Sequence, residues 1–460
     1  MKISDRQLHI ITAGLILLIL IFLMALINRN IVFGSVVGRW FYPYKQGLTL
    51  SAIVICIIAA IVSTTVYLIS VRYIHSHTAL AIFALIMFGF GYTAWLYPRI
   101  GTDPLAVIVG SGSSPFLNQS RAFTPRQLVS GYHSLSPYFP AHGKANMPGK
   151  TLFYYPLRFI SDTNHNIWLM TVLVSSVIGV LVFYLSLFIF NSKETALLSL
   201  VLYLTLPAKL FFAPLLNTIS PLFSVLSLLF LVFILKSKKV YWAILLGVSL
   251  YVMIFFEPML MAIGLIGVVL VMKNIAGGIL SFRELVLTIM IVFLSFLISY
   301  KLVLWLYNFD LAQQYVFILL DSINFNRLTY RGYLTWIFQN PLDFVWGAGV
   351  APSALILLSW GALTVNYLKI RQRYHIRFWK IILSRMELLL TLAFVITLVL
   401  VNFFGVARGE SIRLWIFLMV IWEILAARYA IIAKKSLLVM LLIWGNVIQS
   451  VLTLSVVKFI

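Results

Sequence analysis

The sequence predicts an all-α polytopic membrane protein with about 11–13 transmembrane helices and one long extracytoplasmic loop that carries short helices. Hydrophobic residues make up 62% of the chain and charged residues only 10%, whereas a soluble domain carries about a quarter charged residues. Apolar runs such as LILLILIFLMALI do not alternate in polarity, which argues against a transmembrane β-barrel. Because a spanning segment must satisfy its own backbone hydrogen bonds in lipid, these runs are predicted to be helices.

Roughly thirteen apolar segments are candidates for spans of about 20 residues. The first has a long apolar core and no small-residue cleavage site, which indicates a retained span rather than a signal peptide. Residues 1–460 are expected to form a single transmembrane domain, interrupted by polar segments at 98–165 and 307–346. The predicted spans lie near residues 8–28, 49–71, 79–97, 166–190, 195–213, 221–235, 240–256, 258–272, 284–306, 347–368, 386–404, 413–430 and 436–457.

The positions of the basic residues predict the orientation, because cytoplasmic loops are enriched in Lys and Arg. With the N-terminus in the cytoplasm, the loops on that side carry most of the lysines, and the most basic of them is the run at 369–380. The 98–165 loop then lies outside, and we expect a multi-pass protein of a prokaryotic plasma membrane. Orientation and lipid headgroups account for the net charge of +22, so we expect no nucleic-acid partner.

The 98–165 loop has the composition of an element that binds an anion. It contains six Lys or Arg residues, three histidines and only two acids, which makes it basic on the side where basic residues are not favoured. Its histidines, His133, His142 and His165, are spaced too irregularly for a metal signature. The single cysteine, Cys56, lies inside a predicted span and excludes a disulfide framework. We expect no metal-ligand set and no resident cofactor, and the sequence leaves a divalent cation open.

Two acids on the extracytoplasmic side are candidates for a general base. Asp103 follows the third predicted span and precedes a proline, so it either caps a helix or acts as the base. Glu257, in FFEPML, is flanked by apolar residues where two spans meet. An ionisable side chain at that depth is a functional candidate, with turn capping as the alternative.

The stretch ARGESIRLWIF places Arg408, Glu410 and Arg413 together at the extracytoplasmic mouth of a predicted span. Arginine offers a bidentate fork for a phosphate group, and a glutamate can hold one arginine in position. An interfacial anchor with an internal salt bridge is the alternative interpretation. Lys150, in the long loop, is a further candidate for binding phosphate.

Three stretches together resemble the polyprenyl-phosphate-dependent glycosyltransferases of the GT-C superfamily, which include protein O-mannosyltransferases and lipid A aminoarabinose transferases. ANMPGKTLFYYPL looks like the His-Pro-Pro-Gly segment of these enzymes, with Asn146 and Met147 replacing the histidine and the first proline. LPAKLFFAPLLNTISPLF looks like a span pair in which family members have an acid where this chain has Asn217. ARGESIRLWIF resembles a Gly-Glu-x-x-Arg-x-Trp pattern of the family and matches it at Gly409, Glu410, Arg413 and Trp415.

The chain departs from this family in the first extracytoplasmic loop. Family members usually have a catalytic acid there, whereas the loop at 29–48 contains no acid. Either the first two spans are an added hairpin and Asp103 takes that role, or the catalytic acid is missing. The resemblance covers scattered parts of residues 98–420.

The resemblance implies an integral-membrane glycosyltransferase that moves a hexose or pentose from a polyprenyl-phosphate donor to an acceptor, with inversion. Asp103 and Glu257 would be catalytic, and Arg408, Arg413, Lys150 and Glu410 would bind the donor phosphate. His142, Tyr154, Tyr155 and Asn217 would line the substrate. The implied partners are the lipid-linked sugar, membrane lipid and an acceptor that is a glycan, a lipid or a protein. The alternatives are a transporter or flippase of an anionic lipid-linked saccharide, and a glycan ligase that uses undecaprenyl diphosphate.

Overall fold

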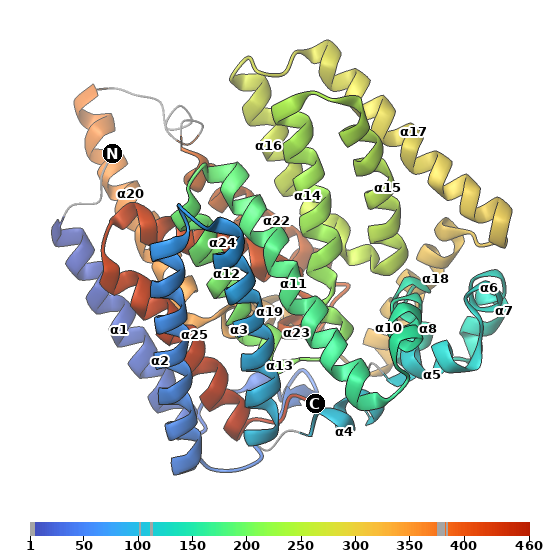
Figure 1. The fold of residues 1–460 in the computed structure, drawn as a ribbon, viewed down its shortest axis with the longest axis horizontal. Coiled ribbons are helices and arrows are strands. Elements are labelled where there is room, and N and C mark those ends of the chain that lie inside the picture. Colours follow the sequence, from blue (N-terminus) through green and yellow to red (C-terminus); the bar gives the residue numbers. More distant parts are fainter. Residues whose placement is uncertain (1–4, 101–102, 111–113, 375–381, 383–384) are drawn as a thin grey trace.

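The protein is an all-α polytopic membrane protein, as the sequence predicts. The computed structural model describes residues 5–100, 103–110, 114–374, 382 and 385–460, and these form almost nothing but helices (Figure 1). Among them, 11 helices are long and apolar enough to cross a membrane, or up to 12 if one bent pair counts as a span. A further apolar helix, α15 (Val240–Phe256), is shorter. The predicted fold class is confirmed.

The apolar helices follow the predicted spans in order. They are α1 (Asp5–Ile27), α2 (Leu50–Tyr73), α3 (Thr78–Arg99), α11 (Asn164–Phe190), α12 (Lys193–Leu204) with α13 (Pro207–Phe211), η2 (Leu216–Thr218) with α14 (Ser220–Ser237), η3 (Pro258–Ile263) with α16 (Gly264–Ala276), α17 (Phe282–Tyr307), α22 (Met386–Phe404), α24 (Ile416–Ala433) and α25 (Ser436–Val456).

The polar segment at 307–346 consists of two helices rather than an irregular loop. α18 (Leu311–Leu328) is followed by α19 (Tyr333–Ala348), which meets α20 (Val350–Tyr374) at a bend of 108°. Most of the basic run at 369–380 lies outside the described residues, and the orientation of the chain stays a prediction.

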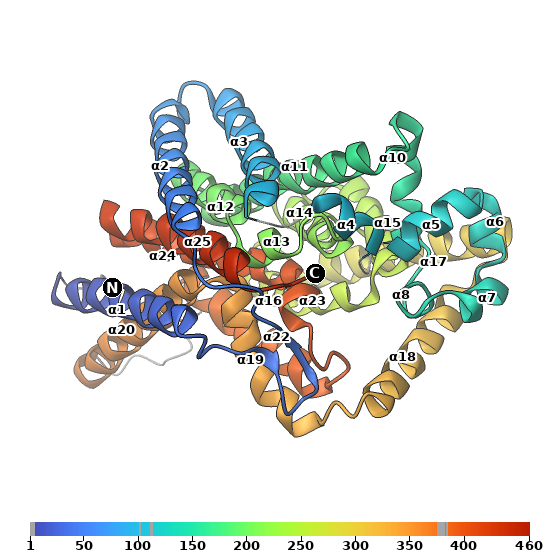
Figure 2. The same cartoon turned by 90° about the horizontal axis from the view of Figure 1, so that it is seen from below.

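The 98–165 loop is a string of short helices at one end of the bundle (Figures 1 and 2). Local capping explains where some of them begin. Thr124 caps α6 by accepting a hydrogen bond from the Gln127 N–H, and the Gln127 side chain accepts one in return from the Thr124 N–H. The short helices are α4 (Pro104–Gly110), α5 (Ser114–Ala122), α6 (Pro125–Ser130), α7 (Tyr132–Leu135), η1 (Ser136–Tyr138), α8 (Ala141–Lys144), α9 (Gly149–Leu152) and α10 (Tyr154–Ile160).

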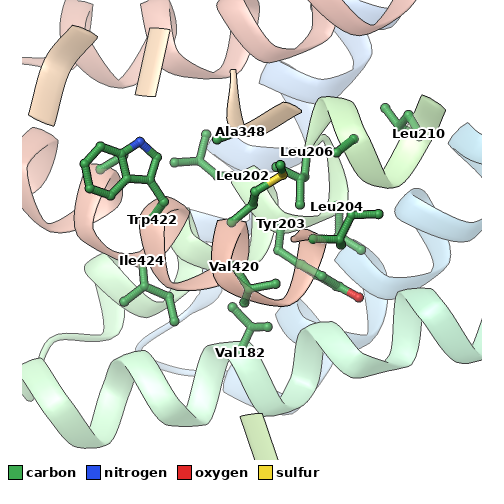
Figure 3. Packing of buried hydrophobic residues seen from close by; sticks show 14 of the residues in the cluster. Val182, Leu202, Tyr203, Leu204, Leu206, Leu210, Ala348, Val420, Trp422 and Ile424 are labelled. Atoms are coloured by element: carbon green, nitrogen blue, oxygen red, sulfur yellow. The ribbon is translucent and has the colours of Figure 1, made fainter. Parts of the chain in front are cut away.

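The core of the molecule lies around α12 and α24, whose side chains pack with those of α11 (Figure 3). Every residue of α12 from Thr195 to Leu204 is buried, and most residues of α24 are buried as well. In contrast, α17 buries only Ser295 and turns apolar side chains outward, as expected of a helix that faces lipid. The bundle is therefore densest at its centre and presents an apolar surface at its edge.

A small β-hairpin occupies the loop between α1 and α2, where the sequence predicts no strand. β1 (Phe33–Ser35) pairs antiparallel with β2 (Trp40–Tyr42). The backbone N–H of Gly34 donates to Asp343 Oδ1 on α19 at 3.0 Å, which ties the hairpin to that helix. The hairpin thus reaches the same end of the bundle as the short helices.

We expect Gly247→Ala to destabilise the protein by separating α15 from α17. An ideal Cβ on Gly247 would lie 2.4 Å from the Val292 carbonyl oxygen and 2.6 Å from Ser295 Cβ. Overpacking of this kind costs about 1–3 kcal/mol, which a lower Tm in detergent would report. Gly91→Ala in α3 is the matched control, because no neighbouring atom lies within 4 Å of that position. Equal Tm values for the two variants would contradict this packing.

Candidate functional site

Lys150 on α9 and Glu257 at the end of α15 form a buried ion pair, with 3.2 Å between Nζ and Oε1. The hydroxyl of Ser220, at the start of α14, donates to the other carboxylate oxygen of Glu257 at 2.5 Å. Either charge alone would lose its hydration on burial at a cost of several kcal/mol. The pair therefore fixes the 98–165 loop to the ends of two apolar helices.

Gly149 explains how Lys150 reaches Glu257. An ideal Cβ on Gly149 would lie only 2.5 Å from the carbonyl oxygen of Phe255, so a larger residue would push α9 away from α15. The preceding turn is held by Tyr132, whose hydroxyl donates to the Asn146 carbonyl oxygen at 2.8 Å. The segment ANMPGK is thus shaped to place one lysine at the end of a span.

A second group of charges forms around Glu410, in the loop that precedes α23 (Ser411–Leu414). Arg331 Nη2 lies 3.4 Å from Glu410 Oε1, and Arg413 hydrogen bonds to Oε2. Arg331 and Arg408 are joined reciprocally, because each guanidinium donates to the backbone carbonyl oxygen of the other, at 2.7 and 3.0 Å. Gly409 has a φ of +86°, which favours glycine, and it turns the chain so that Glu410 faces inward.

Aromatic residues of the β-hairpin and α19 pack against this second group of charges. The ring of Trp336 on α19 lies between two glycines, since a Cβ on Gly38 would come within 2.9 Å of it and one on Gly409 within 3.0 Å. The guanidinium carbon of Arg331 lies 4.7 Å from the centre of the Trp40 ring on β2. A loop without any acid therefore contributes to the site through an aromatic ring and close backbone packing.

The two groups of charges lie within electrostatic range of each other. Burial lowers the pKa of Lys150, Glu257 opposes this shift, and the positive charge of Arg413 adds to it. Burial, Arg413 and Lys150 lower the pKa of His142 on α8, whereas Glu410 acts to raise it. His142 nevertheless keeps contact with solvent. The structure thus brings His142 and Lys150 of the long loop together with Glu410 and Arg413.

Burial alone would raise the pKa of Glu410, but the neighbouring charges outweigh it. The positive charges of Arg413 and Arg331 hold this pKa below its ordinary value, so the carboxylate is ionised at neutral pH. We call the four residues Lys150, Arg331, Arg408 and Arg413 the cationic cluster. Only two carboxylates, those of Glu257 and Glu410, form ion pairs with it among the described residues, which leaves an excess of two positive charges.

Asp103, the predicted base, lies apart from this cluster in its contacts. Its side chain is exposed and accepts a hydrogen bond from the Leu105 N–H at 2.9 Å, which is the geometry of a helix cap. In the described part of the chain, no hydrogen bond or ion pair joins Asp103 to the cationic cluster. Between its two expected roles, the structure favours capping.

The predicted substrate-lining residues occupy different environments. Tyr154 is fully buried, and the Tyr155 hydroxyl donates to the Phe123 carbonyl oxygen at 2.6 Å. Asn217 is buried in η2, three residues before Ser220. Of the four, His142 is the one that is exposed and whose pKa is affected by Arg413, Glu410 and Lys150.

Sequence reasoning missed Arg331 and Ser220. Arg331 lies between two helices in a segment that reads as polar and aromatic, and nothing in its neighbours along the chain marks it as the partner of Glu410. Ser220 is one of many serines within apolar stretches.

No group of three or more His, Cys, Asp or Glu side chains in the described residues could hold a metal ion. Comparison of the chain with protein-family models, with curated proteins and with solved structures finds no match to any of them.

We expect Lys150→Met and Glu257→Gln each to destabilise the protein strongly. Each substitution removes one charge of the pair and leaves the other charge buried without its partner. Breaking a buried pair costs about 3–5 kcal/mol, while replacing both charges removes the desolvation cost as well. The double variant should therefore be more stable than the sum of the single effects predicts. A double-mutant cycle by thermal or denaturant unfolding measures this coupling, and additive losses would show that the two side chains do not interact.

Proposed function

We propose that this protein is an integral-membrane glycosyltransferase of the GT-C type, which transfers a sugar from a polyprenyl-phosphate donor to an acceptor with inversion. The observation that carries the proposal is the cationic cluster, in which the 98–165 loop meets a loop some 250 residues later in the chain. The short helices and the cluster gather at one end of an apolar bundle, where a lipid headgroup would lie. We place this end on the extracytoplasmic side.

The charge of the cluster fits the course of the proposed reaction. A sugar attached to polyprenyl phosphate is a phosphodiester with one negative charge, and the departing polyprenyl phosphate is a monoester that approaches two. An excess of two positive charges therefore stabilises the leaving group more than the bound donor, which is the condition for catalysis. Arg413 is the best placed of the four to contact the phosphate, because it is only partly buried and has Lys150 and His142 as neighbours.

His142 is the base that the geometry supports best. Its lowered pKa keeps the imidazole neutral at pH 7, so that a ring nitrogen can accept a proton from an acceptor hydroxyl. Glu257 is less suited to this role, since Lys150 and Ser220 already occupy its carboxylate oxygens. In this mechanism the acceptor oxygen attacks the anomeric carbon as its proton passes to His142, and the bond to the phosphate oxygen breaks on the opposite face.

Loss of the Arg413 side chain should slow sugar transfer strongly while the protein keeps its fold. For Arg413→Ala we expect kcat to fall by roughly 100-fold, the effect of removing one group that stabilises developing charge. The measurement is transfer from a labelled polyprenyl-phosphate sugar by the full-length protein in lipid nanodiscs. Arg126→Ala is the matched control, because Arg126 lies in the same loop, is exposed and forms no ion pair among the described residues. Equal transfer rates for the two variants would show that the cationic cluster does not contribute to the reaction.

The transfer rate should depend on the protonation of His142. We expect wild-type kcat/KM to decrease as pH falls through the lowered pKa of His142, because protonation removes the base. His142→Gln should lower the rate about 100-fold or more and abolish this acidic decrease. Asp103→Asn tests the competing assignment, since asparagine also caps helices. If Asp103→Asn lost as much activity as His142→Gln, Asp103 would be the base.

The second candidate function is a flippase or transporter of an anionic lipid-linked saccharide. Lys209 favours it, because this lysine is buried in an apolar helix and has no ion-pair partner among the described residues. The two functions differ in product, because a flippase moves the intact donor across the membrane. Reconstituted vesicles that translocate a labelled donor without releasing its sugar would support the flippase.

A further inference from the structure

The 98–165 loop contains an open cavity of about 470 Å³ that the proposed donor site does not use. Residues of α5, η1 and the turn before α8 enclose it. Its volume lies within the range of roughly 300–1,000 Å³ found for small-molecule sites. The lining residues that bear on its chemistry are Asn118, Gln119, Phe123, Tyr138 and Phe139.

The lining chemistry suits a neutral, hydroxyl-rich ligand. No charged side chain lines the cavity among the described residues, which disfavours an anionic or cationic ligand. Phe123, Tyr138 and Phe139 supply aromatic rings, and Asn118 supplies an exposed amide that can both donate and accept hydrogen bonds. A sugar ring has an apolar C–H face that packs on an aromatic ring and hydroxyls that hydrogen bond to amides.

The exposure of the Tyr138 side chain supports a binding role. Tyr138 is 88% exposed on a short 3-10 helix, although an aromatic ring gains free energy from burial. It contributes to the cavity wall, so a ligand there would cover part of the ring. Asn118 is also exposed, and its amide is available to the same ligand.

Gln119 connects the cavity to α8 and α9, which carry His142 and Lys150. Gln119 packs against Gly143 of α8 so closely that a Cβ on Gly143 would lie 2.3 Å from the Gln119 amide nitrogen. His142 directly precedes Gly143, and its pKa responds to Arg413 and Glu410. The Thr151 hydroxyl also donates to the Gln119 amide oxygen at 2.7 Å, which links the cavity to the residue after Lys150.

We propose that this cavity binds a neutral saccharide, which serves as the acceptor of the transferred sugar. The acceptor assignment rests on the proposed glycosyltransferase function, whereas saccharide binding does not. A saccharide held between the Asn118 amide and the aromatic rings would extend toward α8, where His142 receives the proton of the attacking hydroxyl. The donor phosphate would approach from the other side, at Arg413.

The test measures saccharide binding without any donor. Saturation-transfer NMR is recorded on the full-length protein in nanodiscs, with maltotriose, mannotriose and chitotriose as probes. We expect at least one of these probes to bind, and Tyr138→Ala and Asn118→Ala each to weaken its binding about fivefold or more. Phe159→Ala is the matched control, because Phe159 is 93% exposed in the same loop and does not line the cavity. This control should bind like the wild type.

Two results would overturn the proposal. One is the absence of binding by all three probes, and the other is binding that neither Tyr138→Ala nor Asn118→Ala weakens. A failure of the proposed glycosyltransferase function would give a different experimental result. In that case the wild type would bind a saccharide with the expected dependence on Tyr138, yet transfer no sugar from a polyprenyl-phosphate donor. A bound saccharide that is also a substrate, with KM raised in Tyr138→Ala and kcat little changed, would support both.

Discussion

The buried ion pair between Lys150 and Glu257 is the interaction on which the candidate site depends. Neither charge is stable in this environment without the other, so the loop that carries Lys150 must stay docked on the ends of α14 and α15. Gly149 makes the contact sterically accessible, because any side chain there would collide with the backbone of α15. With α9 fixed in this way, α8 and His142 are held at the edge of the second group of charges. The proposed base and the proposed phosphate ligand Arg413 then lie within electrostatic range of each other.

The second group of charges is stabilised in a different way. Glu410 lies between Arg331 and Arg413, and these two arginines come from segments that are far apart in sequence. The reciprocal bonds between Arg331 and Arg408, together with Trp336 packed between two glycines, join α19, the β-hairpin and the loop before α23. A site assembled from three separate segments can be rigid when each of them packs against the others. Preorganised charges of this kind stabilise a developing negative charge without having to reorient.

The fold was predictable from the sequence because each span carries its own signal. An apolar run of about 20 residues is sufficient to identify a membrane helix, and every predicted span has a helix in the structure. The strands at 33–35 and 40–42 were not predictable, since three residues are too few to show alternation. The site was predictable only in part. Arg413, Glu410 and Lys150 stand in polar stretches with recognisable chemistry, whereas the importance of Arg331 depends on a contact with Glu410, 79 positions away.

The most direct measurement is the position of the phosphate in an experimental structure of the full-length protein with undecaprenyl phosphate, determined by cryo-electron microscopy in nanodiscs. Our account predicts that the phosphate lies between the 98–165 loop and α23, hydrogen bonded to Arg413 and next to His142. It also predicts that the Lys150–Glu257 pair stays intact when the lipid binds. A phosphate bound elsewhere, with Arg413 still facing only Glu410, would contradict the account.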